Sequence, residues 1–431
     1  MIIRFKVDNY RSFKDETTID FVSNSHIHFD DEHRYDFGRL HILKNTGIFG
    51  ANASGKTTIV NAISVVRNFI MTGKIDNNIA FKGQANKPTK FSIVFENNNS
   101  FYEYSFAIRH NRQINFVEVL EESLYELKLS GSNILIYDRK TGTQNPDSDD
   151  FATFERGYHN TIGVLFLTYM SAPERIIKDS KVSQCFLKVY SYFARKVSPI
   201  VHENELLFSI CEENINVIRD KLHEYDTGIE SVDFVKPLEL EKIKLMNDNY
   251  IKRNVIVTLL RDPNPRFDYY YSDGFDIFMF RKENKNITIK KLLFKHVNIE
   301  ERFSFIDESE GTKLIFSLIA TLLCSDNSDR TFFIDEIERS SHPVVVRQII
   351  RDFQRANKGN KSQLIFTSHL NSLMDEVLQR DEIYFVEKND FGASSVRSLQ
   401  LYSSRNRREN ISEKYLEGRY GALPNIGVDI N

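Results

Sequence analysis

The feature that most constrains this chain is a glycine-rich loop close to its N-terminus. Residues 50–58 read GANASGKTT, which is a glycine, four further residues and then Gly-Lys-Thr. A short apolar run, residues 46–49, precedes the loop, and apolar residues recur at helical spacing after it to about Thr72. The pattern predicts a strand, a phosphate-binding loop and a helix, in that order.

The chemistry of such a loop follows from its residue types. Its glycines let backbone N–H groups turn toward phosphate oxygens, and the following helix presents the positive end of its dipole. Lys56 would reach the β- and γ-phosphates as a catalytic cation, and the Thr57 hydroxyl would bind Mg²⁺. The sequence therefore predicts ATP and Mg²⁺ as cofactors. The residues predicted to contact them here are Gly50, Asn52, Ala53, Ser54, Gly55, Lys56, Thr57 and Thr58.

A second acidic element lies far along the chain. Residues 332–336 read FFIDE, an apolar strand that ends in two carboxylates. Asp335 is predicted to hold Mg²⁺ through water, and Glu336 to polarise the attacking water as a general base. A solvated strand end is the alternative, but it leaves two adjacent carboxylates without a purpose.

Two further residue groups gain meaning from their order along the chain. Thr367-Ser368-His369 ends the next predicted strand, and ligands of open α/β sheets bind at such strand ends, so His369 is predicted to reach the γ-phosphate. Ser309 and Gly311 open the helix before the FFIDE strand, where free N–H groups can bind an anion. Simple helix capping explains Ser309 equally well.

The rest of the chain is read from its periodicity. Residues 303–387 alternate helix and strand with continuous apolar strands, as a parallel sheet requires. Period-two alternation predicts a strand pair within the first 25 residues and an antiparallel meander over 90–127. Residues 180–236 are predicted to be helical and 255–294 to be β-like. The nucleotide fold is therefore split by a large insertion.

Composition excludes several classes of protein. There are 57 Lys plus Arg against 60 Asp plus Glu, a net charge of −3, which indicates no nucleic-acid binding through bulk charge. Cys185, Cys211 and Cys324 are too far apart for a CxxC site, and they favour a reducing, cytoplasmic setting. The longest apolar stretch, residues 314–324, is about half of the ~20 residues that a spanning helix needs, so no membrane association is expected.

Two features leave nucleic acid open as a partner. Residues 405–408, RNRR, are the densest basic run, although such a run is more often a solvated surface. The aromatic stretch 267–271 could stack bases, but a β-strand with one face in the core fits it better.

With these motifs in place, the chain resembles the ABC-type ATPase heads of RecF, SMC and OLD-family proteins. The opening IRFKVDNYRSFKDETTIDF is similar to their N-terminal strand pair, and the resemblance implicates Arg11 as a nucleotide contact. More narrowly, the motifs DESEGTK, FIDEIERSSHP, FTSHLNSLMD and YLEGRYGALPNIG resemble AAA-type core-domain ATPases of bacterial anti-phage operons, the RloA and AbiLi type.

The resemblance implies a fold and a domain plan. The fold class is α/β, an ABC-type P-loop ATPase head with a split, mixed sheet that an α+β insertion interrupts. Residues 1–105 would form the N-terminal part of the head, 106–300 the insertion, and 301–431 the C-terminal part with the signature helix and His369.

The resemblance also implies a mechanism shared between protomers. In ABC heads two protomers dock head to tail, so Ser309 and Gly311 of one would contact the γ-phosphate held by Lys56 of the other, with residues 340–342 at the seam. The chain is thus expected to work as a homo-oligomer. The family's Mg²⁺-sensing glutamine has no counterpart in residues 169–173, and that role stays unassigned.

Three functions compete at this point. The first is the ATPase subunit of an anti-phage complex that senses infection and controls a separately encoded effector, such as a nuclease or Toprim protein, because no nuclease motif is visible in this chain. The second is a RecF- or SMC-like repair ATPase that clamps DNA. The third, a transporter motor, is disfavoured because the P-loop helix and the signature helix are far apart in sequence, at residues 72 and 311.

Overall fold

The computed structural model divides the chain into two compact units, which are described separately below. The first unit comprises residues 1–201, 328–337 and 357–431, and the second comprises 202–327 and 338–356. The structure describes residues 1–23, 31–76, 79–111, 116–128, 131, 133–141, 149–158, 163–172, 175–176, 180–200, 214–261, 268–273, 275–283, 286–323, 329–402 and 410–423.

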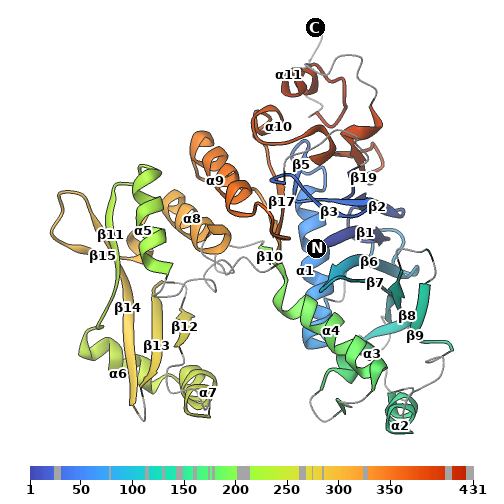
Figure 1. Ribbon diagram of the computed structural model, residues 1–431, viewed down its shortest axis with the longest axis horizontal. Coiled ribbons are helices and arrows are strands. Elements are labelled where there is room, and N and C mark those ends of the chain that lie inside the picture. The colour runs from blue at the N-terminus through green and yellow to red at the C-terminus, as the bar shows by residue number, and fades with distance from the viewer. Residues whose placement is uncertain are drawn as a thin grey trace. The chain divides into compact units, whose positions relative to one another are not determined.

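The first unit contains a mixed six-stranded sheet in the order β10-β16-β17-β5-β18-β19 (Figure 1). The first five strands are parallel, and β19 is antiparallel to β18. Because β17 lies between β16 and β5, the loops that follow these three strands emerge side by side at one edge. The strands are β5 Asn45–Phe49, β10 Val197–Ile200, β16 Thr331–Ile334, β17 Gln363–Thr367, β18 Ile383–Lys388 and β19 Ser394–Ser398.

A second, antiparallel sheet of the first unit has the order β2-β1-β6-β7-β8-β9. The predicted N-terminal strand pair and meander are both confirmed. Asn98 and Asn99, with φ of 51° and 63°, form the left-handed turn between β6 and β7. The strands are β1 Ile2–Asp8, β2 Thr17–Asp20, β6 Thr89–Asn97, β7 Ser100–Asn111, β8 Phe116–Leu127 and β9 Asn133–Asp138, and a separate hairpin pairs β3 Arg34–Phe37 with β4 Leu40–Leu43.

The P-loop helix α1 links the two sheets through one core. Ile59, Val60 and Phe69 of α1 share a buried cluster with side chains of both sheets, including Phe95 and Phe333. The helices of this unit are α1 Lys56–Thr72, α2 Asp149–Tyr158, α3 Phe166–Met170, α4 Lys181–Arg195, α10 Leu373–Glu376 and α11 Ile411–Leu416, with 3₁₀ turns at Arg380–Glu382 and Leu399–Leu401.

One correction concerns α3. The apolar run GVLFLTYM, residues 163–170, is strand-like in sequence, but Phe166–Met170 form a helix. The buried carboxylate of Glu122 on β8 accepts the N–H groups of Phe166 at 2.7 Å and Leu167 at 3.0 Å. It thereby caps the helix start from a distant strand. Burial raises the pKa of Glu122, although these N–H groups lower it in part. A tertiary contact therefore decides the local conformation.

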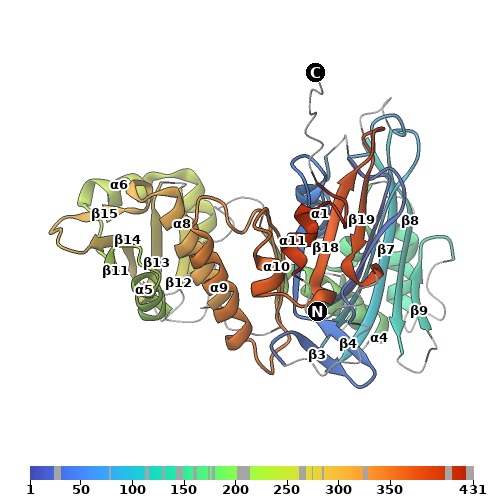
Figure 2. The same ribbon diagram turned by 90° about the horizontal axis from the view of Figure 1, so that it is seen from above.

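The second unit is α+β. Its five-stranded antiparallel sheet has the order β11-β14-β13-β12, and β15 pairs with β14. The strands are β11 Ile229–Val235, β12 Asp268–Ser272, β13 Ile277–Glu283, β14 Asn286–His296 and β15 Arg302–Ser304. The helices are α5 Ile215–Glu224, α6 Glu239–Asn247, α7 Val257–Arg261, α8 Glu310–Leu318 and α9 Pro343–Ala356, with π-helical stretches at Ile251–Ile256 and Ile319–Leu323 and a 3₁₀ turn at Phe305–Asp307. In both views α8 and α9 lie close together (Figures 1 and 2).

The units differ from the predicted domain plan. The boundary at 105/106 falls inside β7, because β7 to β9 extend the sheet that β1 begins. Conversely, α8 and α9, predicted for the C-terminal part of the head, belong to the second unit. The helical prediction for residues 180–236 is wrong at β10 and β11, and the β-like prediction for 255–294 is wrong at α7.

No helix within the described ranges has both the length and the apolar character that crossing a bilayer demands.

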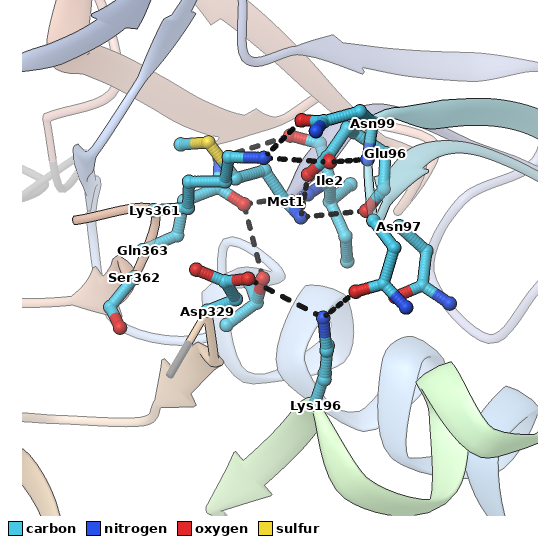
Figure 3. A network of polar contacts seen from close by, with 12 residues as sticks. Met1, Ile2, Glu96, Asn97, Asn99, Lys196, Asp329, Lys361, Ser362 and Gln363 are labelled. Carbon is cyan, nitrogen blue, oxygen red and sulfur yellow. Dashed lines mark hydrogen bonds and ion pairs between the residues drawn. The ribbon is translucent and has the colours of Figure 1, made fainter. Parts of the chain in front are cut away.

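The N-terminal strand is tied to the parallel sheet by the amide of Gln363 (Figure 3). Its Oε1 accepts the Ile2 N–H at 2.6 Å and the Thr331 hydroxyl at 3.1 Å, and its Nε2 donates to the carbonyls of Ile2 and Leu43 at 2.9 and 2.8 Å. Beside it, Lys361 pairs with Glu96 at 3.0 Å. Burial alone would raise the pKa of Glu96, but the Met1 amine, the Asn99 N–H and Lys361 outweigh it and lower that pKa.

This geometry predicts a stability effect at Gln363. The Gln363→Leu substitution leaves several buried polar groups without hydrogen-bond partners. The free energy of unfolding should therefore fall by about 3 kcal/mol in a urea titration. Thr331→Val removes only one of the four bonds and should cost about 1 kcal/mol. Equal losses in the two variants would contradict the assignment of Gln363 as the tie between the sheets.

Candidate nucleotide-binding site

The loop between β5 and α1 has a backbone conformation that requires glycine at two positions. Gly50 has φ of 154°, and a Cβ there would lie 2.2 Å from the Val386 carbonyl oxygen of β18. Gly55 has φ of 120°, and a Cβ there would lie 2.6 Å from Ser394 Oγ. A side chain at either position would therefore push the loop away from its neighbours.

Lys56 holds this loop closed on itself. Its side chain is buried, and its ammonium group donates to the carbonyls of Gly50 at 2.9 Å and Ala51 at 3.1 Å. The N-terminus of α1 has no side-chain cap and no acidic residue in its first turn. Ser54 Oγ is buried and has no hydrogen-bond partner among the described residues. Uncapped N–H groups, an ammonium and an unpaired hydroxyl together fit the phosphates of a nucleotide.

The hydroxyl of Thr367 holds the Asp335 carboxylate and the Glu336 backbone at the end of β16. That hydroxyl donates to Asp335 Oδ1 at 2.6 Å and accepts the N–H of Glu336 at 2.8 Å. Glu336 takes a left-handed backbone, φ 48°, which is unusual for a residue with a side chain. His369 Nε2 lies 3.9 Å from Glu336 Oε1, and both side chains are partly exposed. Asp335, Glu336 and His369, which the sequence predicted to act together, thus lie at one edge of the sheet.

The residues present also fit a magnesium ion. The Thr57 side chain is exposed at the start of α1, and Asp335 is held by Thr367 at the end of β16. In the described part of the chain no cluster of three or more metal-ligating side chains occurs. A site of this composition suits Mg²⁺, which keeps waters and takes substrate phosphate oxygens as ligands. When bound, the ion would neutralise charge on the phosphates.

A N-terminal segment packs against the loop, as the resemblance implied. Ser12 Oγ contacts Thr58 Oγ1 at 3.5 Å, and the Ser12 carbonyl accepts the N–H of Ser394 at 2.7 Å. Ser394 Oγ in turn donates to the Ser54 carbonyl at 2.5 Å. Arg11 has φ of 47° and an exposed side chain, and its N–H is bound by the Ile79 carbonyl. The sequence alone indicated no role at the site for Ser12, Ser394 and Thr367, because these residues act through tertiary contacts.

An open cavity of about 680 Å³ adjoins the loop. One side is formed by residues 50–54 and by the segment that carries His369, and another by the C-terminal segment around Tyr415 and Ala422. This C-terminal wall was not anticipated from the sequence.

Ser309 and Gly311 belong to the second unit. Ser309 is the N-cap of α8, and its hydroxyl accepts the N–H of Thr312 at 3.1 Å. A Cβ on Gly311 would lie 2.5 Å from the Ser340 carbonyl oxygen, so glycine lets α8 approach that turn closely. The capping alternative is therefore real, and the contact of these two residues with a partner's nucleotide stays a prediction.

Other candidates are placed as follows. Tyr269 and Tyr271 lie on β12 and pack partly against a buried cluster, which favours the β-strand interpretation. Cys185 lies on α4. The basic run 405–408, Cys211, Cys324, Phe267 and Pro173 lie outside the described residues.

The Thr367 hydroxyl, which bridges Asp335 and the Glu336 N–H, leads to a testable prediction. Thr367→Val keeps the side-chain shape but frees Asp335, so the Mg²⁺ concentration needed for half-maximal ATP turnover should rise about tenfold. The control is Thr331→Val, which removes a buried hydroxyl at the opposite end of the neighbouring strand. If both variants need the same Mg²⁺ concentration as the unaltered chain, Thr367 does not orient Asp335.

Comparison with known proteins places this geometry in a family. The profile of the family described as "AAA domain, putative AbiEii toxin, Type IV TA system" matches residues 46–160 and 218–375, more than half of the chain. The chain belongs to this family. The match includes the P-loop, Asp335, Glu336 and His369. The predicted fold class, the mixed α/β fold of a P-loop ATPase of the AAA/ABC type, is confirmed.

Among curated proteins none matches the sequence. Solved structures that are similar include an SMC head bound to the C-terminal winged-helix domain of ScpA (13% identity, 92% and 96% of the two chains covered, TM-score 0.42). Others are the SMC head domain from Thermotoga maritima (14%, 92% and 98%, 0.35) and a Pyrococcus furiosus Smc head with an extended coiled coil bound to the C-terminal domain of ScpA (13%, 97% and 99%, 0.37).

Proposed function

We propose that this member of the AAA family hydrolyses ATP with Mg²⁺ and serves as the ATPase subunit of a bacterial anti-phage complex. The meeting of Asp335, Glu336 and His369 at the sheet edge beside the P-loop carries the first part of the proposal. Lys56 and the N–H groups of the loop bind the phosphates, and Glu336 takes a proton from the attacking water. His369, next to Glu336, donates to the γ-phosphate.

The biological part of the proposal rests on the family description and on the motifs. The family description names a toxin and a toxin–antitoxin system, and the motifs resemble those of anti-phage operons. In this proposal ATP joins two or more protomers head to tail, and closure or release of the oligomer controls an effector encoded by another gene. An ATP-linked change between two docked states is a known form of switching.

Two measurements test the two parts separately. Purified protein should release phosphate from ATP with Mg²⁺ and lose this activity in EDTA. Cells that carry the intact operon should resist phage. Cells whose operon carries Lys56→Ala should be as sensitive to phage as cells that lack the operon. Turnover without protection would remove the defence role. Turnover stimulated by duplex DNA in a salt-sensitive way would favour the repair ATPase instead.

A further inference from the structure

The C-terminal segment, residues 410–423, contacts the P-loop at one point and the helix α10 at another. At its far end the carbonyl of Ala422 accepts the N–H of Ala51, the residue after Gly50, at 2.9 Å. At its near end the N–H groups of Ile411 and Ser412 are bound by the carboxylate of Asp375 at 2.7 and 2.9 Å. Asp375 lies on α10, the short helix that follows the His369 loop. In both views α10 and α11 are neighbours (Figures 1 and 2).

Between these two points the segment is held firmly. Tyr415 and Tyr420 both stack on Phe385 of β18, with ring centroids 5.3 and 5.4 Å apart and planes within 8° and 14°. The Tyr402 hydroxyl donates to the carbonyl of Tyr420 at 3.0 Å. Such aromatic pairs contribute more than their buried area alone.

One hydrogen bond connects the helix of the segment to its contact with the P-loop. The Tyr415 hydroxyl donates to the Ala422 carbonyl at 3.1 Å, so that oxygen accepts from both Tyr415 and Ala51. A carbonyl oxygen has two lone pairs and can satisfy both donors. Gly421 and Ala422, with φ of 69° and 59°, form the turn that presents this carbonyl.

We infer that residues 410–423 act as a positioning element that fixes the P-loop relative to the His369 loop and forms one wall of the nucleotide pocket. The inference rests on the proposed function, since it concerns the same ATP site. The bond from Ala51 sets the start of the P-loop, and the bonds to Asp375 anchor the other end of the segment on α10, the helix that follows the His369 loop. A nucleotide that enters the adjoining cavity meets this segment.

The first test uses a fluorescent reporter, because the chain contains no tryptophan. Leu416 lies in the cavity wall and is exposed, so Leu416→Trp places a single reporter there. Mg²⁺ with ATP should change its emission. The control is Phe391→Trp, an 87% exposed position in the β18–β19 turn, where no change is expected. Adding Lys56→Ala to Leu416→Trp should abolish the change.

The second test removes the connecting hydroxyl. Tyr415→Phe keeps the stack on Phe385 but loses the bond to Ala422, so KM for ATP should rise about three- to tenfold and the Ala51 amide should exchange faster with deuterium. Tyr250→Phe, an exposed tyrosine of the second unit, is the matched control and should change neither quantity.

The outcomes separate the two claims. If a fluorescent ATP analogue binds the unaltered chain but Leu416→Trp stays silent and Tyr415→Phe keeps the normal KM, the positioning role is refuted while the ATP site stands. If no analogue binds, the proposed function fails, and this inference with it.

Discussion

Lys56→Ala is expected to weaken ATP binding by roughly 10- to 100-fold, the loss that follows when charge-assisted hydrogen bonds to a phosphate are removed. In the structure the same ammonium also bonds to the carbonyls of Gly50 and Ala51, so its removal loosens the loop that must present its N–H groups. Titration with a fluorescent ATP analogue measures the effect.

The control for this substitution is Lys74→Ala. Lys74 is exposed just beyond the end of α1, so the Lys74→Ala substitution removes the same charge without changing the loop. Its affinity for the analogue should equal that of the unaltered chain. If Lys56→Ala binds the nucleotide as tightly as Lys74→Ala, the loop does not bind phosphate in the way described.

Glu336→Gln is expected to retain ATP binding and to slow turnover by about 10²- to 10⁴-fold, the usual contribution of a general base. The amide has nearly the same shape, but it cannot accept a proton from water. Unhydrolysed ATP should then hold protomers together, so light scattering in Mg²⁺ and ATP should detect a larger particle than without nucleotide.

Glu300→Gln, at an exposed position of the second unit, serves as the control and should leave turnover unchanged. Wild-type turnover in Glu336→Gln would show that another group activates the water.

The sequence predicted the nucleotide edge of the fold well, because each of its parts is a local motif. The glycine loop, the FFIDE strand and the strand before His369 each combine a continuous apolar run with polar residues at its end. Only their side-by-side placement needed the structure, and the order β16-β17-β5 supplies it. The roles of these residues in catalysis stay predictions.

The domain boundaries were not predictable from the same patterns. Period-two alternation shows that residues 100–111 form a strand, but it does not show which sheet the strand joins. Pairing of β6 with β1 draws the whole meander into the first unit. The short helix α3 was missed for a related reason, since Glu122, distant in sequence, provides the N-terminal cap.

The central claim, an ATP site shared between two protomers, is tested most directly by mixing two inactive variants. Lys56→Ala removes the phosphate-binding lysine of the P-loop. Gly311→Asp disrupts the start of α8, where a side chain would clash with the Ser340 carbonyl oxygen. If the site is shared head to tail, each variant alone is inactive, but each mixed dimer contains one intact site of two. Because about half of the dimers in an equimolar mixture are mixed, the mixture should recover about a quarter of normal turnover. No recovery from a mixture shown to exchange subunits would contradict the account.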